Sequence, residues 1–129
     1  MPTISKPKIA PEILAQIEEQ FEQEKQVIVH CCFQNNYILG NLVRIWPSTF
    51  LVDKFTGCSS KLIFWENIAV FPYWTDVPPV KEYCFTLIFS ALPKECKVFD
   101  FVEEVIQGSG FLVTDIERNE TDVYTLKLT

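Results

Sequence analysis

Closely spaced apolar runs between residues 27 and 71 constrain the fold of this chain more than any other feature. The first run, Val27 to Phe33, places every second side chain on the same face, as a β-strand does. Four further runs follow between turn residues, at 37–45, 49–53, 61–65 and 68–71. Five short strands in so short a stretch predict a small, strongly bent barrel, and Gly40 in the second run permits a sharp bend.

The flanking segments predict helices as well as strands. Before the barrel, Pro11 to Lys25 carries Leu14, Ile17 and Phe21 at helical spacing, which predicts an amphipathic helix. After a stiff connector at 72–79, the pattern predicts a strand at 83–92, a helix at 95–107 and a hairpin of 111–117 with 123–128. The expected class is α+β: an N-terminal helix and barrel at 1–74, and a β-α-β-β extension at 75–129 packed on the barrel as one structural unit.

Composition limits the partners and surroundings of the protein. A net charge of −6 repels a phosphate backbone and argues against non-specific binding of nucleic acids or anionic membranes. The chain has no recognisable secretory leader and no long apolar run, so we expect a cytoplasmic protein that does not span a membrane. Eleven phenylalanines and three tryptophans exceed what a core of this size needs, which predicts an exposed aromatic surface for a partner. The five cysteines lack C-x-x-C spacing and predict buried free thiols; they are Cys31, Cys32, Cys58, Cys84 and Cys96.

Several short motifs in the first half of the chain resemble one known family. They are Val27-Ile28-Val29, the turn Asn35-Asn36, Ile38-x-Gly40-x-Leu42-x-x-Ile45, Phe50-Leu51-Val52 and the segment from Lys61 to Phe71. With the predicted N-terminal helix, they resemble the Sm-like (Hfq-like) small β-barrels, an SH3-type fold. The resemblance implies a ring in which 61–65 of one subunit pairs with 68–71 of the next. Because Pro72 ends the last strand and the extension needs apolar surface to cover, we expect a monomer or small oligomer instead, with a dimer favoured.

The resemblance also indicates where the family holds single-stranded RNA. Those positions fall here on Trp46, Phe50 and the pair Phe64–Trp65, none of which donates a charged hydrogen bond to phosphate or base. Asn67 alone keeps a family-like residue type. RNA binding by the family mechanism is therefore not expected, although aromatic rings can stack on bases. We take these residues as the candidate contacts for a protein partner or for RNA.

Catalytic and metal-binding patterns are weak. His30 is the only histidine, and although it shares a strand face with Cys32, the two stand about 6.5–7 Å apart along the strand, too far for direct proton transfer. His30, Cys31, Cys32 and Cys58 lack closed metal-ligand spacing. We therefore expect no catalytic residue, metal or cofactor. The preferred hypothesis is a non-enzymatic protein-interaction or assembly module, which binds a protein partner or a second copy of itself; the alternatives are a single-stranded RNA-binding protein with an aromatic surface and an enzyme centred on His30.

Overall fold

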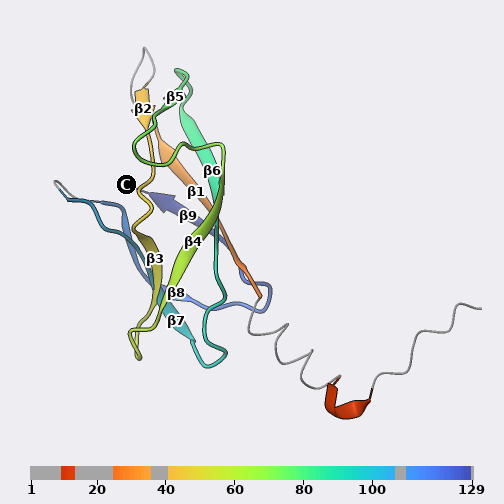
Figure 1. Cartoon of the computed structure of the whole chain (residues 1–129). Coiled ribbons are helices and arrows are strands. Elements are labelled where there is room, and N and C mark those ends of the chain that lie inside the picture. The colour runs from red at the N-terminus through yellow and green to blue at the C-terminus, as the bar shows by residue number, and fades with distance from the viewer. Residues whose placement is uncertain (1–9, 14–24, 36–40, 107–109, 129) are drawn as a thin grey trace, which may run out of the picture.

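Nine β-strands make up most of the regular structure in the computed structural model, which describes residues 10–13, 25–35, 41–106 and 110–128 (Figure 1). Five of them alternate buried side chains with less buried ones, as strands do when one face lies on a core. In chain order they are β1 (Val27–Gln34), β2 (Asn41–Val43), β3 (Thr49–Asp53), β4 (Ser59–Glu66), β5 (Thr75–Val77), β6 (Glu82–Phe89), β7 (Val98–Glu103), β8 (Leu112–Glu117) and β9 (Val123–Leu128).

Seven of these strands form one sheet, in the order β8-β7-β3-β4-β6-β1-β9. Neighbours are antiparallel except β1 and β9, which run parallel, with Ile28 beside Val123 and Phe33 beside Leu128. The end strands β8 and β9 are consecutive along the chain, and the sheet curls until it nearly closes into a barrel (Figure 1). β2 and β5 form a separate two-stranded ribbon at the upper end of the view in Figure 1.

The core lies inside the curled sheet. Buried side chains of β1 and β6 face one another across the strand pair, as Val29 and Leu87 do. Rings from the second half of the chain pack edge to face, with 4.9 Å between the ring centroids of Phe99 and Tyr124. Strands from both halves therefore share one core. Its largest fully buried side chains are Phe89, Phe99, Phe101, Ile45, Leu51 and Leu87.

The predicted α+β class is wrong, because the chain is nearly all β. Of the described residues, 55% are strand and 3% are helix. Within the predicted N-terminal helix, residues 11–13 are described and helical, whereas 14–24 lie outside the described residues. Gly40 lies outside them too, so its role in bending a strand stays a prediction.

The predicted helix at 95–107 is also wrong, since its centre is the strand β7. Val98, Phe101 and Val102 fit a helical stripe, but Phe99 and Phe101 are both fully buried, and that spacing of two is the period of a strand. The segment is rich in β-branched and aromatic residues, which favour strands. The segment pairs with β3 on one side and with β8 on the other, so the strand period applies and not the helical one.

The remaining strand predictions divide into confirmed and wrong. The runs at 27–33, 49–53 and 61–65 are strands or the main part of strands, and the run at 83–92 is strand up to Phe89. The predicted five-stranded barrel of the first half does not form by itself, because β1 pairs with β6 and β9 and not with the next strand along the chain. The run at 68–71 contributes only an isolated bridge between Val70 and Ile45. The strands at 111–117 and 123–128 exist, but they do not pair as a hairpin: β8 pairs with β7 and β9 with β1.

A partly buried ion pair fixes the connection between β8 and β9. Arg118 donates two hydrogen bonds to Asp122, from Nε to Oδ1 at 2.9 Å and from Nη2 to Oδ2 at 3.0 Å. The Tyr124 hydroxyl donates to Asp122 Oδ1 at 2.9 Å, and Asp122 itself has a φ of 53° and is only 3% exposed. Its carbonyl accepts a bond from the Ile28 N–H at 2.9 Å, so the corner ties the end of β8 to the start of β1. This corner lets the last strand return beside the first.

Candidate functional site

The segment from Arg44 to Trp46 carries two partly exposed side chains that form an unusual group with neighbouring aromatic rings. Its middle residue, Ile45, is fully buried, and its N–H and C=O bond to the Ala69 carbonyl and the Phe71 N–H, each at 2.9 Å. Neighbours of a buried residue in extended chain point to the opposite side. Arg44 and Trp46 are therefore held on the outer side, next to the segment that leads into β5.

Three aromatic rings surround the Arg44 guanidinium. Its Cζ lies 3.8 Å from the ring centroid of Trp74, 4.6 Å from that of Phe71 and 5.6 Å from that of Trp46. Trp46 and Phe71 stack on each other at 4.1 Å with an interplanar angle of 18°. Attraction between a cation and the ring faces holds such a group together, at about 0.5–2 kcal/mol for each close contact. We call Arg44, Trp46, Phe71 and Trp74 the aromatic–arginine cluster.

The cluster is open to solvent and has unused hydrogen-bonding capacity. Trp74 is 53% exposed and Phe71 39% exposed. The guanidinium of an arginine has five N–H donors, and Nη1 of Arg44 donates to the Pro72 carbonyl at 3.3 Å. Among the described residues, no carboxylate forms an ion pair with Arg44. The cluster therefore offers stacked rings and a charged donor group on one small surface.

A buried carboxylate positions Trp46. Glu103 is 8% exposed, and its two oxygens accept hydrogen bonds from the Trp46 N–H at 3.0 Å and the Phe111 N–H at 3.2 Å. Burial raises the pKa of Glu103, and these two backbone bonds offset only part of that rise. The Trp46 carbonyl also accepts a bond from the Thr49 hydroxyl at 2.6 Å. The N–H and the carbonyl of Trp46 are thus both held by hydrogen bonds, which limits the positions that its ring can take.

Gly110 allows this arrangement. A Cβ added at Gly110 would lie 1.9 Å from the Glu103 carbonyl oxygen, a backbone atom that cannot turn aside. The glycine lets the chain return to β8 in close contact with the end of β7.

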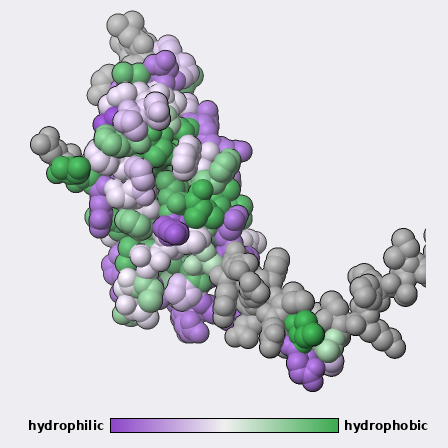
Figure 2. Space-filling view, in the orientation of Figure 1, coloured by the Kyte–Doolittle hydropathy of each residue, from purple (hydrophilic) through white to green (hydrophobic). Residues whose placement is uncertain are grey.

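The structure places two other predicted contact residues away from this cluster. Phe64 and Trp65 lie on β4, with 6.5 Å between their ring centroids, and they are 52% and 41% exposed. Figure 2 shows apolar side chains exposed around this part of β4. Phe64 is the register partner of Ile88, and Ile88 that of Ile28, so the apolar surface continues across neighbouring strands.

The last two predicted contact residues lie elsewhere again. Phe50 is partly buried on β3, between its register partners Lys61 and Val102. Asn67 has a φ of 64° and holds the turn after β4: its Nδ2 donates to the Cys84 carbonyl at 2.7 Å, and its own carbonyl accepts from the Tyr83 hydroxyl at 2.6 Å. The structure brings neither of them to the aromatic–arginine cluster.

The expectation of five buried free thiols is wrong for three cysteines. Cys31 and Cys96 are free and buried, and burial raises the pKa of the Cys31 thiol to about 12. Cys58 is free but exposed, on the turn between β3 and β4. Cys32 and Cys84 form a disulfide because β1 and β6 place them directly opposite each other, a pairing that their sequence separation of 52 conceals.

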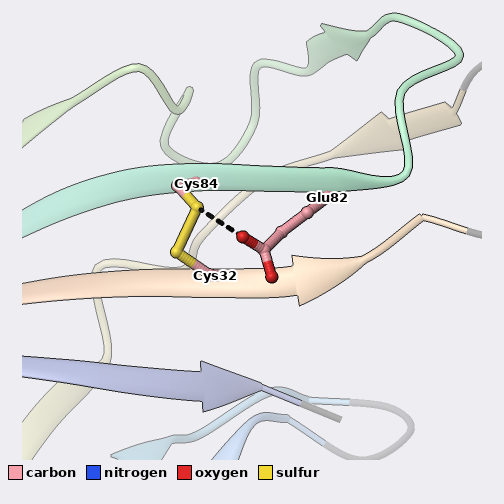
Figure 3. A group of neighbouring side chains, drawn as sticks. All are labelled: Cys32, Glu82 and Cys84. Atoms are coloured by element: carbon pink, nitrogen blue, oxygen red, sulfur yellow. Dashed lines mark hydrogen bonds between the residues drawn. A yellow bond between two sulfur atoms is a disulfide. The ribbon is translucent and has the colours of Figure 1, made fainter.

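An acidic side chain accompanies this disulfide. Glu82 lies two residues before Cys84 on the same face of β6, and its Oε1 is 3.8 Å from Cys84 Sγ (Figure 3). Figure 3 shows the Glu82 carboxylate turned toward the two sulfurs. His30 lies further along the same face of β1, exposed, and its Nδ1 is 2.8 Å from the Thr86 hydroxyl.

Sequence reasoning found part of the aromatic–arginine cluster and missed the rest. Trp46 was a candidate contact, whereas Arg44, Phe71 and Trp74 were not. The alternation around Ile45 could have placed Arg44 beside Trp46, because residues two apart in extended chain share a side. Trp74 carries no such signal, since it joins the group only when the segment before β5 folds back against β2.

Comparisons with known proteins identify no relative of this chain: no family model, no curated protein and no solved structure matches it. The resemblance to the Sm-like family therefore stays a prediction. In the part of the chain that the structure describes, no helix has the length and apolar character needed to cross a membrane.

Proposed function

We propose that the protein is a non-enzymatic interaction module that binds a protein partner through the aromatic–arginine cluster. The ligand we infer is a peptide segment with apolar side chains and at least one carboxylate. The observation that carries this proposal is the Arg44 guanidinium, held among three aromatic rings at the surface without an ion pair to any described carboxylate.

Exposed tryptophan and arginine are typical of protein-binding surfaces. These two residue types are enriched among the side chains that contribute most to binding, because each combines a large contact area with a directed hydrogen-bond donor. Stacking on Trp74 and the backbone bonds at Ile45 and Trp46 keep the side chains in place before a partner arrives. Such preorganisation lowers the entropic cost of binding.

The charge of Arg44 determines the chemistry of the partner. The Arg44 guanidinium lies over the ring of Trp74 and has N–H donors beyond the Nη1 that bonds to Pro72, and a pair of such donors matches the two oxygens of a carboxylate. Rings on either side supply the apolar contact. An Asp or Glu next to aromatic or aliphatic residues satisfies both requirements.

Single-stranded RNA is the second candidate, because stacked rings beside a guanidinium can also hold a base and a phosphate. The net charge of −6 opposes it, since affinity for nucleic acid depends on several basic contacts. We expect no binding of U-rich or A-rich single-stranded RNA tighter than micromolar at physiological salt. Saturable nanomolar binding in an anisotropy titration would favour RNA over a protein partner.

Selection from phage-displayed random linear peptides tests the proposal. We expect the wild-type chain to enrich sequences with an acidic residue beside apolar ones, and W74A and R44A to lose their binding. F55A is the matched control, since Phe55 is an exposed aromatic residue, 79% exposed, on the turn between β3 and β4. Enrichment of peptides that bind W74A and R44A as well as the wild type would refute the assignment of this surface, and so would failure to enrich any peptide.

A further inference from the structure

A second group of side chains lies apart from the aromatic–arginine cluster, on the outer face of β1 and β6. Cys32 and Cys84 are register partners with their Cα atoms 4.1 Å apart, and Glu82 is the next residue on the same face of β6. One ligand atom from each of the three residues, two sulfurs and a carboxylate oxygen, lies within 4.8 Å of the other two (Figure 3).

The sulfur–oxygen spacing in this group is close to that between two ligands of a tetrahedral zinc ion. With Zn–S of about 2.3 Å and Zn–O of about 2.1 Å, a tetrahedral angle separates sulfur from oxygen by about 3.5 Å. Glu82 Oε1 lies 3.8 Å from Cys84 Sγ, so this edge of the tetrahedron is nearly in place. Two thiolates and one carboxylate give three protein ligands, which leaves a fourth position for water or another ligand.

We propose that Cys32, Cys84 and Glu82 form a binding site for one thiophilic divalent cation, Zn²⁺ in particular, when the Cys32–Cys84 disulfide is reduced. The disulfide and the metal exclude each other, because a sulfur in a disulfide is not a thiolate and does not bind zinc. In the oxidised state a covalent bond thus joins the two cysteines, and in the reduced state a metal ion joins all three side chains.

Replacing the disulfide by a bound metal ion requires a two-electron reductant. A dithiol or a phosphine in water supplies two electrons and two protons, the S–S bond breaks, and Cys32 and Cys84 become thiols while the reductant becomes its disulfide or its phosphine oxide. Zn²⁺ then forms two Zn–S bonds and one Zn–O bond, and the two thiol protons leave to solvent. The loaded site carries one net negative charge.

Neighbouring side chains support the loaded state. Gln34 Nε2 donates to Glu82 Oε2 at 3.3 Å, which leaves Oε1 directed toward the sulfurs. Lys127 on β9 is the register partner of Cys32, so a positive charge stands on the other side of the group. Because β1 lies between β6 and β9, its backbone is held on both edges, and the two sulfurs must move apart for a metal to bind between them.

Zinc titration of the full chain in both redox states tests this proposal. The chain is reduced with a phosphine, freed of reductant under anaerobic conditions, and titrated with ZnCl₂ against a chromophoric chelator. We expect one equivalent of Zn²⁺ bound by the reduced chain and none by the oxidised chain. The C32A/C84A variant should bind none, and E82Q should bind about ten-fold or more weakly than the wild type.

C58S is the matched control, because Cys58 is an exposed cysteine outside the site, and it should keep full binding. E82Q leaves both cysteines in place, so it tests the site even if the cysteine variant does not fold. Equal binding by oxidised and reduced chains would overturn the proposal, as would unchanged affinity in E82Q or loss of binding in C58S. Absence of Zn²⁺ binding by the reduced, folded wild type would overturn it as well.

Discussion

Replacing Asp122 by alanine should destabilise the fold more than any other single carboxylate change at the corner between β8 and β9. The Asp122 carboxylate accepts two bonds from Arg118 and one from the Tyr124 hydroxyl, at 2.9, 3.0 and 2.9 Å. D122A leaves a largely buried guanidinium without its anion. It also leaves the hydroxyl of Tyr124, a residue only 6% exposed, without that acceptor.

The expected loss of stability in D122A follows from the ion pair that it breaks and from the backbone conformation of residue 122. Removing one partner of a buried ion pair costs about 3–5 kcal/mol. The lower end applies here, because Arg118 keeps hydrogen bonds from Nη1 to the Pro93 and Cys96 carbonyls. Alanine at the φ of 53° adds about 1–2 kcal/mol, since a Cβ disfavours this region and aspartate tolerates it better. We therefore expect D122A to lower the free energy of unfolding by about 4–5 kcal/mol, and D122N by less, because asparagine tolerates the backbone and keeps one oxygen acceptor.

Urea denaturation followed by tryptophan fluorescence measures this difference, and an unchanged slope with denaturant shows that the same transition is compared. E120A is the matched control: Glu120 is an exposed carboxylate in the same turn, and its removal should change the free energy of unfolding by no more than about 0.5 kcal/mol. A loss of less than about 1 kcal/mol in D122A would contradict the assigned role of this network in closing the sheet.

Three further predictions rest on single residues. G110A should lower the free energy of unfolding by about 1–3 kcal/mol, because its Cβ would overlap the Glu103 backbone, and a thermal melt measures this. Burial tends to raise the pKa of the Asp122 carboxyl, but its hydrogen bonds and nearby positive charges lower this pKa on balance. The carboxylate therefore stabilises the fold fully above the pKa that it has in the unfolded chain, and this contribution is lost as pH falls through the folded pKa. D122N should accordingly flatten the acid side of a curve of stability against pH. A thiol reagent should label Cys58 of the folded chain quickly and Cys31 only on unfolding. Mass spectrometry of the labelled peptides measures the order, and earlier labelling of Cys31 would refute the prediction.

Alternation of apolar and polar residues correctly predicted the strands that keep one face on the core along their length. β1, β3 and β6 each have one face on the core, so their period of two is visible in the residues themselves. β7 also alternates in the fold, but its valines and phenylalanines fit a helical stripe equally well, and only its two neighbouring strands settle the assignment. The parallel pairing of β9 with β1 joins the last strand to the first, which no local pattern indicates.

The candidate sites depend on the same non-local contacts. Trp46 was selected through a family position, and Phe71 and Trp74 join it and Arg44 only after the chain returns from β4 toward β5. Cys32 and Cys84 look like unrelated cysteines until β1 and β6 pair in register. Residue types therefore indicated an aromatic surface and five thiols, while the pairing of strands decided which side chains meet.

The central claim, that Arg44 in the aromatic–arginine cluster binds a carboxylate of a partner, is tested most directly by a double-mutant cycle. A peptide selected by the wild-type chain and its Asp→Asn or Glu→Gln analogue are each titrated against the wild type and R44A by fluorescence anisotropy. We predict a coupling energy of about 1.5–3 kcal/mol between Arg44 and the acidic residue, as for a charged hydrogen-bonded pair. Coupling near zero, with R44A and the wild type losing equal affinity for the neutral peptide, would contradict the account.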